Sequence, residues 1–195
     1  MRHQEKIAVL IGDVALPLIG FFFWDWGFYF IALYFLADQL TKQIFLFFRF
    51  KSINLSTSFK VILLSKSYIL FFVQVLIIIL INYQITSDFN PVNGLVSFLT
   101  YKDMGIQQGV ILIPLLIFAE WMKLKADRKL NLSDEIKQKK INNNLQSSQI
   151  HLAVIGFILG IINFLVLPAS IIVYIFLVGI GLPVFLSTSK QKRPA

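Results

Sequence analysis

The sequence predicts an all-α integral membrane protein, a polytopic bundle of six transmembrane helices with both termini in the cytoplasm. Hydrophobic residues make up 57% of the 195 positions and charged residues only 14%, against about a quarter in soluble domains. The apolar residues form runs that suit membrane helices, since a helix needs roughly 20 residues to cross about 30 Å of hydrocarbon. Sixteen of the eighteen Lys and Arg residues fall on one side of these six spans, and short basic loops stay cytoplasmic.

The first apolar stretch, residues 7–50, decides the number of spans. It is too long for one crossing, and residues 24–27, Trp-Asp-Trp-Gly, interrupt it near the middle. Indole rings favour the headgroup level of a membrane, so this tetrapeptide predicts an interfacial turn inside a helical hairpin. The two helices of the hairpin are predicted over Ile7–Phe23 and Gly27–Phe48. The alternative is a five-span protein with a single first span, but it leaves Arg2 and Lys6 outside the cell.

The other spans follow from shorter apolar runs, and together they form one membrane domain over residues 1–195. These spans are predicted over Val61–Asn82, Gly105–Met122, His151–Leu167 and Ser170–Leu186. The last two make a second hairpin around Pro168, because proline ends one helix and can begin the next. Residues 83–104 are predicted to form a periplasmic loop and residues 123–149 a cytoplasmic loop. Within the cytoplasmic loop, Ser133 is a candidate helix N-cap and residues 142–144, Asn-Asn-Asn, indicate loop.

Charge and cysteine content narrow the partners and the chemistry. The net charge of +8 flanks the apolar spans, which indicates contact with anionic lipids and not with nucleic acid. The absence of cysteine excludes disulfides, thiolate catalysis and cysteine metal sites. Abundant Ile, Phe, Lys and Asn are typical of an AT-rich bacterial genome. We therefore expect the protein in the bacterial inner membrane.

Three ionisable residues in the first hairpin form the leading candidate site. Asp13 and Asp38 lie twelve and thirteen residues on either side of Asp25, so antiparallel helices would bring them to nearly the same depth. Lys42 follows Asp38 on the same helix face, in an i,i+4 relation. Carboxylates at membrane depth are costly and often functional. Two interpretations stay open: a structural ion pair, or a functional carboxylate site for an ion or a proton.

Glu120 and His151 form a second candidate pair, because both fall near the cytoplasmic ends of their predicted spans. A carboxylate and an imidazole at one membrane face suit a proton relay or acid–base work. The alternative places Glu120 in an i,i+3 pair with Lys123 and His151 in the headgroup zone. Gln74, Gln108, Asn163 and Tyr174 are interpreted as hydrogen-bond partners between helices.

Small residues at a spacing of four predict close helix contacts. The two pairs of this kind are Gly105 with Gly109, and Gly156 with Gly160. The sequence contains no His-Glu-x-x-His, no Gly-x-Ser-x-Gly and no phosphate-binding glycine loop. We therefore predict no catalytic residue, no metal site and no cofactor.

Two short segments resemble an uncharacterised family of small polytopic bacterial and archaeal membrane proteins. The first runs from Leu16-Pro17-Leu18-Ile19-Gly20 through Trp26 to Tyr34-Phe35-Leu36-Ala37-Asp38. The second joins Ile150-His151-Leu152 to the Leu167-Pro168-Ala169 hairpin. The chain departs from the family where Phe35 stands for Trp and Asp38 for Glu. The resemblance supports the span layout and marks Asp38 and His151, but it implies no activity.

Three classes of function fit these observations. The absence of site motifs favours a non-catalytic accessory or assembly subunit, which would contact a membrane-protein partner or a second copy of the chain. A small ion- or proton-coupled transporter using intramembrane carboxylates is the alternative. An intramembrane lipid-modifying enzyme is the second alternative.

Overall fold

The computed structural model describes residues 16–51, 57–86, 88–100, 108–129, 134–165 and 167–189. This part of the chain forms seven helices and no strand, which confirms the predicted all-α class. The helices are α2 (Leu16–Phe23), α3 (Phe28–Lys51), α4 (Thr57–Ile85), α5 (Pro91–Thr100), α6 (Gln108–Lys129), α7 (Asp134–Phe164) and α8 (Ala169–Ser189).

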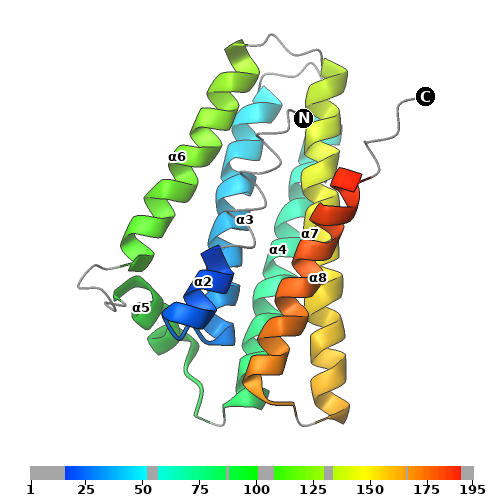
Figure 1. Cartoon of the computed structure of the whole chain (residues 1–195). Coiled ribbons are helices and arrows are strands. Elements are labelled where there is room, and N and C mark those ends of the chain that lie inside the picture. The colour runs from blue at the N-terminus through cyan, green and yellow to red at the C-terminus, as the bar shows by residue number, and fades with distance from the viewer. Residues whose placement is uncertain are drawn as a thin grey trace.

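Helix α3 is the centre of the bundle and contacts α2, α4, α5, α6, α7 and α8. Helices α3, α6 and α8 run in one direction, and α4 and α7 run in the other (Figure 1). The short helix α5 lies at the end of the bundle where α4 ends and α6 begins (Figure 1).

The two ends of the bundle carry different residues. We call the end where α3 and α6 finish and α4 and α7 begin the basic end. It is defined by Arg49, Lys51, Lys60, Lys123, Lys129 and Lys137. The described residues of the opposite end, around the α2–α3 turn and α5, include the acids Asp25 and Asp88 but no Lys or Arg. This segregation is the one expected of membrane-flanking basic residues.

Three helices in the described part are long and apolar enough to cross a membrane: Phe28–Arg49, Thr57–Ile85 and Ile141–Asn163. A shorter apolar helix covers Ser170–Gly181. The protein is therefore membrane-associated by length and composition. The count of six spans, the orientation of the termini and the first half of the first hairpin stay predictions, the last because residues 1–15 lie outside the described ranges.

The α2–α3 turn occurs where the sequence predicts it, and its second tryptophan is buried. Asp25 has a positive φ of 51°, and the Gly20 carbonyl accepts hydrogen bonds from the backbone N–H groups of Trp24 at 3.1 Å and Trp26 at 3.0 Å. The chain thereby folds back under α2, and the Trp26 ring lies against Gly20, which has no Cβ to obstruct it. Trp26 is 2% exposed. The Trp26 ring thus packs inside the bundle, and the interfacial depth predicted for the turn stays a prediction.

The second hairpin also forms at its predicted place. Helix α7 ends at Phe164 and α8 begins at Ala169, directly after Pro168. The Pro168 carbonyl accepts a hydrogen bond from the Ile171 N–H at 3.0 Å, which closes the first turn of α8.

Both segments predicted as loops contain helix, and the loop predicted at residues 142–144 is wrong. Helix α6 extends to Lys129, and α7 is continuous from Asp134 through the asparagines at 142–144, so little of residues 123–149 is loop. Ile141 and Leu145, one turn apart on α7, are both buried, and this packing overrides the low helix propensity of asparagine. The start of α7 at Asp134 agrees with the predicted cap at Ser133, which itself lies outside the described residues.

Residues 83–104 contain α5 and the last turn of α4. The Asn90 side-chain oxygen accepts hydrogen bonds from the N–H groups of Val92 at 3.0 Å and Asn93 at 3.1 Å, and Pro91 fills the first helical position. Phe98 is buried and joins α5 to the core of the bundle.

Buried apolar residues form two clusters along the bundle axis. The larger one, here the aromatic core, lies toward the opposite end. Its members include Trp26, Phe28, Ile31, Phe35, Ile78, Ile81, Phe98, Ile155, Ile158, Ile172 and Phe176. The smaller one, here the basic-end cluster, consists of Leu46, Leu63, Ile141 and Leu145.

Candidate functional site

Polar side chains occupy the layer between the two apolar clusters. Helices α3, α4 and α7 each pass through the same order, from the basic-end cluster through polar residues to the aromatic core. We call this middle level the polar layer. Its members are Asp38, Gln39, Lys42 and Gln43 of α3, Ser67 and Gln74 of α4, and Asn144, Ser148 and His151 of α7.

The polar layer includes the predicted Asp38–Lys42 pair. The Lys42 ammonium donates to the Asp38 carboxylate in an i,i+4 ion pair. The Asp38 side chain is 10% exposed and that of Lys42 is 23% exposed. The structure therefore brings these two candidates together. Asp13, the third member of the predicted site, lies outside the described residues.

His151 is held by Gln39, a contact that joins α7 to α3 across 112 positions of sequence. The Gln39 amide nitrogen and His151 Nδ1 form the hydrogen bond, and His151 packs edge-on to Phe35 with ring centroids 6.1 Å apart. In this orientation the amide donates, so Nδ1 accepts and the ring proton of a neutral imidazole lies on Nε2. His151 thus contacts α3 inside the bundle.

Asp38, Gln39 and His151 lie near the middle of helices that are long enough to cross a membrane. Asp38 and Gln39 are the two central residues of Phe28–Arg49, and His151 is within one residue of the centre of Ile141–Asn163. A carboxylate, an ammonium and an imidazole therefore share one level near the middle of these helices.

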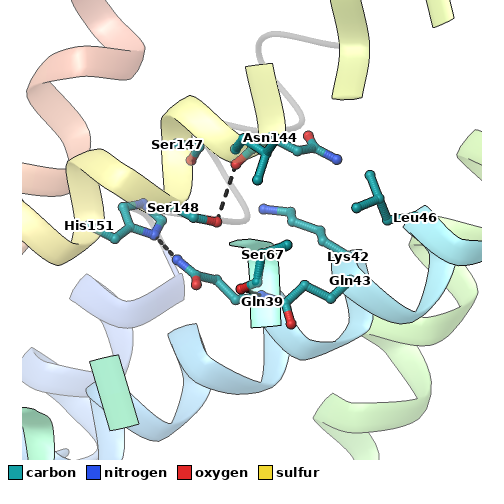
Figure 2. Close-up of a pocket in the computed structure, with 10 residues that line it drawn as sticks. Gln39, Lys42, Gln43, Leu46, Ser67, Asn144, Ser147, Ser148 and His151 are labelled. Carbon is teal, nitrogen blue, oxygen red and sulfur yellow. Dashed lines mark hydrogen bonds between the residues drawn. The ribbon is translucent and has the colours of Figure 1, made fainter. Parts of the chain in front are cut away.

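A small cavity opens within the polar layer, between α3, α4 and α7 (Figure 2). The space that is open to water-sized molecules has a volume of about 40 Å³. The cavity is lined by Gln39, Lys42, Gln43, Leu46, Ser67, Asn144, Leu145, Ser147, Ser148 and His151. A single water needs about 10–15 Å³ by this measure, so the cavity holds only a few. In Figure 2 the Lys42 side chain extends from α3 toward Asn144 and Ser148 of α7.

The cavity lining contains buried polar atoms without a hydrogen-bond partner in the described structure. They are the side-chain oxygens of Gln39 and Gln43 and the side-chain nitrogen of Asn144. Gln39 and Gln43 are 5% and 4% exposed. Buried polar groups are normally paired, and water commonly supplies the missing partner.

Two further hydrogen bonds fix the helices around the cavity. The Gln43 amide donates to the Ser67 carbonyl at 3.1 Å, and the Gln74 amide donates to the Ser148 carbonyl at 2.7 Å. The interhelical role predicted for Gln74 is thereby confirmed, and Asn163 accepts from Gln84 of α4 at 2.7 Å. The sequence analysis gave no site role to Gln43, Ser67 or Ser148, because only the packing of three helices brings them to one level.

Glu120 lies apart from the polar layer, in an ion-pair cluster near the basic end. Its buried carboxylate accepts from Lys123 at 2.6 Å, which confirms the i,i+3 pair, and from Arg49 of α3 at 3.2 Å. This cluster links α6 to α3. No contact between Glu120 and His151 is found among the described residues, so the second candidate pair of the sequence analysis gains no support.

Two of the glycines singled out by their spacing, Gly156 and Gly160, have no close neighbour in the described chain. An added Cβ at Gly156 or Gly160 would meet nothing within 4 Å, Gly109 lies in α6, and Gly105 is outside the described residues. Close approaches occur at other glycines. A Cβ would overlap the Trp26 ring at Gly20 and the Tyr29 ring at Gly94, and it would lie 2.7 Å from Val154 at Gly179.

Within the described ranges, no group of three His, Asp or Glu side chains is arranged to hold a metal ion. No protein-family model, no curated protein and no solved structure matches the chain. The resemblance to an uncharacterised membrane family therefore stays a prediction, and function is argued from the geometry of the site.

Proposed function

We propose that this protein is a small proton-conducting or proton-coupled transporter of the bacterial inner membrane, with the polar layer as its proton site. The observation that carries the proposal is the position of Asp38, Lys42 and His151. All three lie near the middle of helices that are long enough to cross a membrane. Lys42 and His151 line the same small cavity, and Asp38 pairs with Lys42.

The energetic argument concerns what such groups cost. A charged side chain at the bilayer centre is unfavourable by about 2.5–3.5 kcal/mol or more, so ionisable residues there usually line ion or proton pathways. The Asp38–Lys42 pair offsets part of this cost by mutual neutralisation. A neighbouring imidazole adds a group that can accept and donate a proton.

The size of the cavity favours a proton over a larger substrate. A space of about 40 Å³ holds a few waters and no lipid or metabolite. Water bound to the free oxygens of Gln39 and Gln43 would join His151 to Lys42 by hydrogen bonds. The lipid-modifying enzyme considered from the sequence would need a cleft of lipid size beside Glu120 and His151, and these residues lie in separate clusters.

The orientation that fits this proposal has the basic end in the cytoplasm. Lys and Arg residues gather there in the described chain, and anionic headgroups of the inner leaflet would attract them. Six spans, with Asp13 joining Asp38 and Lys42 from the first span, remain part of the proposal.

The direct test is proton flux into liposomes that hold the purified protein and a pH-sensitive dye. We expect flux in the unaltered protein and its loss in His151→Gln, which keeps a polar side chain but removes the titratable ring. The double variant Asp38→Asn, Lys42→Met should also lose flux, because both partners of the ion pair in the polar layer are removed.

Gln84→Leu is the matched control for these variants, since Gln84 is a polar residue of α4 that is exposed and distant from the cavity. It should conduct normally. Equal flux in all variants, or none in the unaltered protein under a membrane potential, would refute the proposal.

The accessory subunit is the second candidate, and one surface feature favours it. An apolar groove of about 620 Å³ runs between α7 and α8, lined by Ala153, Val154, Phe157, Tyr174, Val178 and their neighbours. Beside it, Gly156 and Gly160 leave space for the close approach of another transmembrane helix.

A partner helix in this groove would be lost when the groove is filled. Val178→Trp places a large side chain there, whereas Leu76→Trp alters an equally exposed position on α4. Affinity purification in mild detergent with mass spectrometry should find a membrane protein that is retained by Leu76→Trp and lost from Val178→Trp. Its absence from the unaltered protein would remove this candidate.

A further inference from the structure

We infer that the polar layer is reached from the basic end alone, through the basic-end cluster, which acts as a thin apolar gate. This inference rests on the proposed function and specifies the path by which water and protons reach its site. It follows from the unequal barriers on the two sides of the cavity.

On the basic side the apolar barrier is about one helical turn thick. Leu46 is three residues beyond Gln43 on α3, and Leu145 is three residues before Ser148 on α7. At about 1.5 Å per residue, three residues correspond to roughly 5 Å along each helix. The two leucines therefore form an apolar layer about one helical turn thick. Leu46 and Leu145 also line the cavity itself, so their side chains form part of its wall.

Ionised groups lie directly beyond this barrier. Arg49 is one turn past Leu46 and pairs with Glu120, whose other partner Lys123 is 49% exposed. The outer side of the basic-end cluster is therefore flanked by charged side chains, one of them half exposed. On the inner side, the Lys42 side chain keeps 23% of its surface exposed, and Ser147 at the cavity edge is exposed.

On the other side the barrier is thick and closely packed. The aromatic core fills α3 from Leu36 back to Phe28, which corresponds to roughly 12 Å along the helix. On the aromatic-core side of His151, the space open to water is only about 10 Å³. It lies among residues that include Phe35, Ile78, Ile155 and Phe176. The rings of Phe35 and Phe176 meet edge to face, with centroids 5.3 Å apart. Among these described residues the packing leaves no room for a file of water.

A single apolar constriction a few ångströms long is the kind of element that gates by wetting and drying. Enlarging it should admit water more often, while an equal deletion in the aromatic core should not. Shortening a buried side chain to alanine should therefore increase water entry when the residue lies in the basic-end cluster, but not when it lies in the aromatic core.

The test uses the absence of native cysteine. Ser148→Cys places one thiol on the cavity wall, and a small charged methanethiosulfonate reagent reports its contact with water. The reagent is added to right-side-out and to inside-out membrane vesicles. We expect labelling only from the basic side, and roughly tenfold faster labelling when Leu46→Ala or Leu145→Ala is added.

Ile158→Ala is the matched control, because Ile158 is as buried as Leu46 but lies in the aromatic core. It should leave the labelling rate unchanged. Labelling from the opposite side, or equal acceleration by Ile158→Ala and Leu46→Ala, would overturn the inference. An unchanged rate in both Leu→Ala variants would overturn the gate.

Failure of this inference is distinguishable from failure of the proposed function. Labelling measures water access and needs no transport. One-sided, Leu46-dependent labelling without proton flux would keep the access path and refute the transporter. Proton flux with labelling from the opposite side would keep the transporter and refute the access path.

Discussion

From Phe28 to Leu36, helix α3 contacts its neighbours mainly through aromatic and aliphatic side chains, whereas from Asp38 to Arg49 it also contacts them through amides and ions. The first segment belongs to the aromatic core and the second to the polar layer and the basic end. Between membrane helices, apolar association depends on close packing and not on exclusion of water. The aromatic core therefore gains stability from shape, with Phe28 and Phe35 both edge-on to Phe176.

The polar half gains less stability and more chemical capability. Its contacts leave two buried amide oxygens without partners in the described structure and enclose a cavity. Proteins tolerate such incomplete packing mainly at functional sites, where stability is given up for activity. One half of the bundle therefore mainly stabilises the fold, and the other half holds the polar groups that could carry out chemistry. Four predictions test this division, beginning with the most destabilising change.

Trp26→Ala should be the most destabilising change, with a loss of about 3–5 kcal/mol, because it empties a large buried volume in the aromatic core. Thermal unfolding in mild detergent measures the loss. The indole nitrogen has no hydrogen-bond partner in the described structure, so Trp26→Phe should recover much of the stability. Phe72→Ala, at a position 66% exposed, should change little. Equal effects of Trp26→Ala and Phe72→Ala would show that the aromatic core is not the stabilising half.

Asp38→Asn should lower stability by roughly 1–3 kcal/mol, since it leaves the Lys42 ammonium without its carboxylate while partial exposure moderates the loss. Adding Lys42→Met should restore most of the stability, because the orphaned charge is removed as well. The same unfolding measurement applies to both variants. A double variant as unstable as Asp38→Asn alone would contradict the ion-pair explanation.

Gly20→Ala and Gly160→Ala form a matched pair on the two kinds of glycine. The first adds a methyl group that collides with the Trp26 ring, so a loss of about 1–3 kcal/mol is expected. The second adds a methyl group into open space on a helix, which should be neutral or stabilising by up to about 1 kcal/mol. If Gly160→Ala destabilises instead, that face of α7 contacts a second chain in the folded protein.

Gln74→Leu should have the smallest effect, a change of about 1 kcal/mol or less. It removes one hydrogen bond to the Ser148 carbonyl and replaces the buried amide by an apolar group of similar size. A melting temperature close to that of the unaltered protein, with altered proton flux, would place Gln74 on the functional side of the comparison. A loss as large as that of Trp26→Ala would abolish the distinction between the halves.

Much of the fold and part of the site were predictable, because they depend on residues close in the chain. The breaks at residues 24–27 and at Pro168 gave both hairpin turns, and apolar runs gave the helices. The Asp38–Lys42 and Glu120–Lys123 pairs follow from helix periodicity alone. The predicted loop over residues 142–144 failed because local propensity yielded to the burial of Ile141 and Leu145.

By itself the sequence determined the class of protein, the helix positions, the segregation of basic residues and the pairs of neighbouring charges, since composition and periodicity decide each of them. Only the tertiary structure decided which polar residues meet. Gln39 with His151, Gln74 with Ser148 and Arg49 with Glu120 are separated by 112, 74 and 71 positions. Such contacts depend on how helices rotate and shift against one another, and side-chain shape across several helices sets that rotation. The cavity, its thin apolar cover and the burial of Trp26 have the same origin.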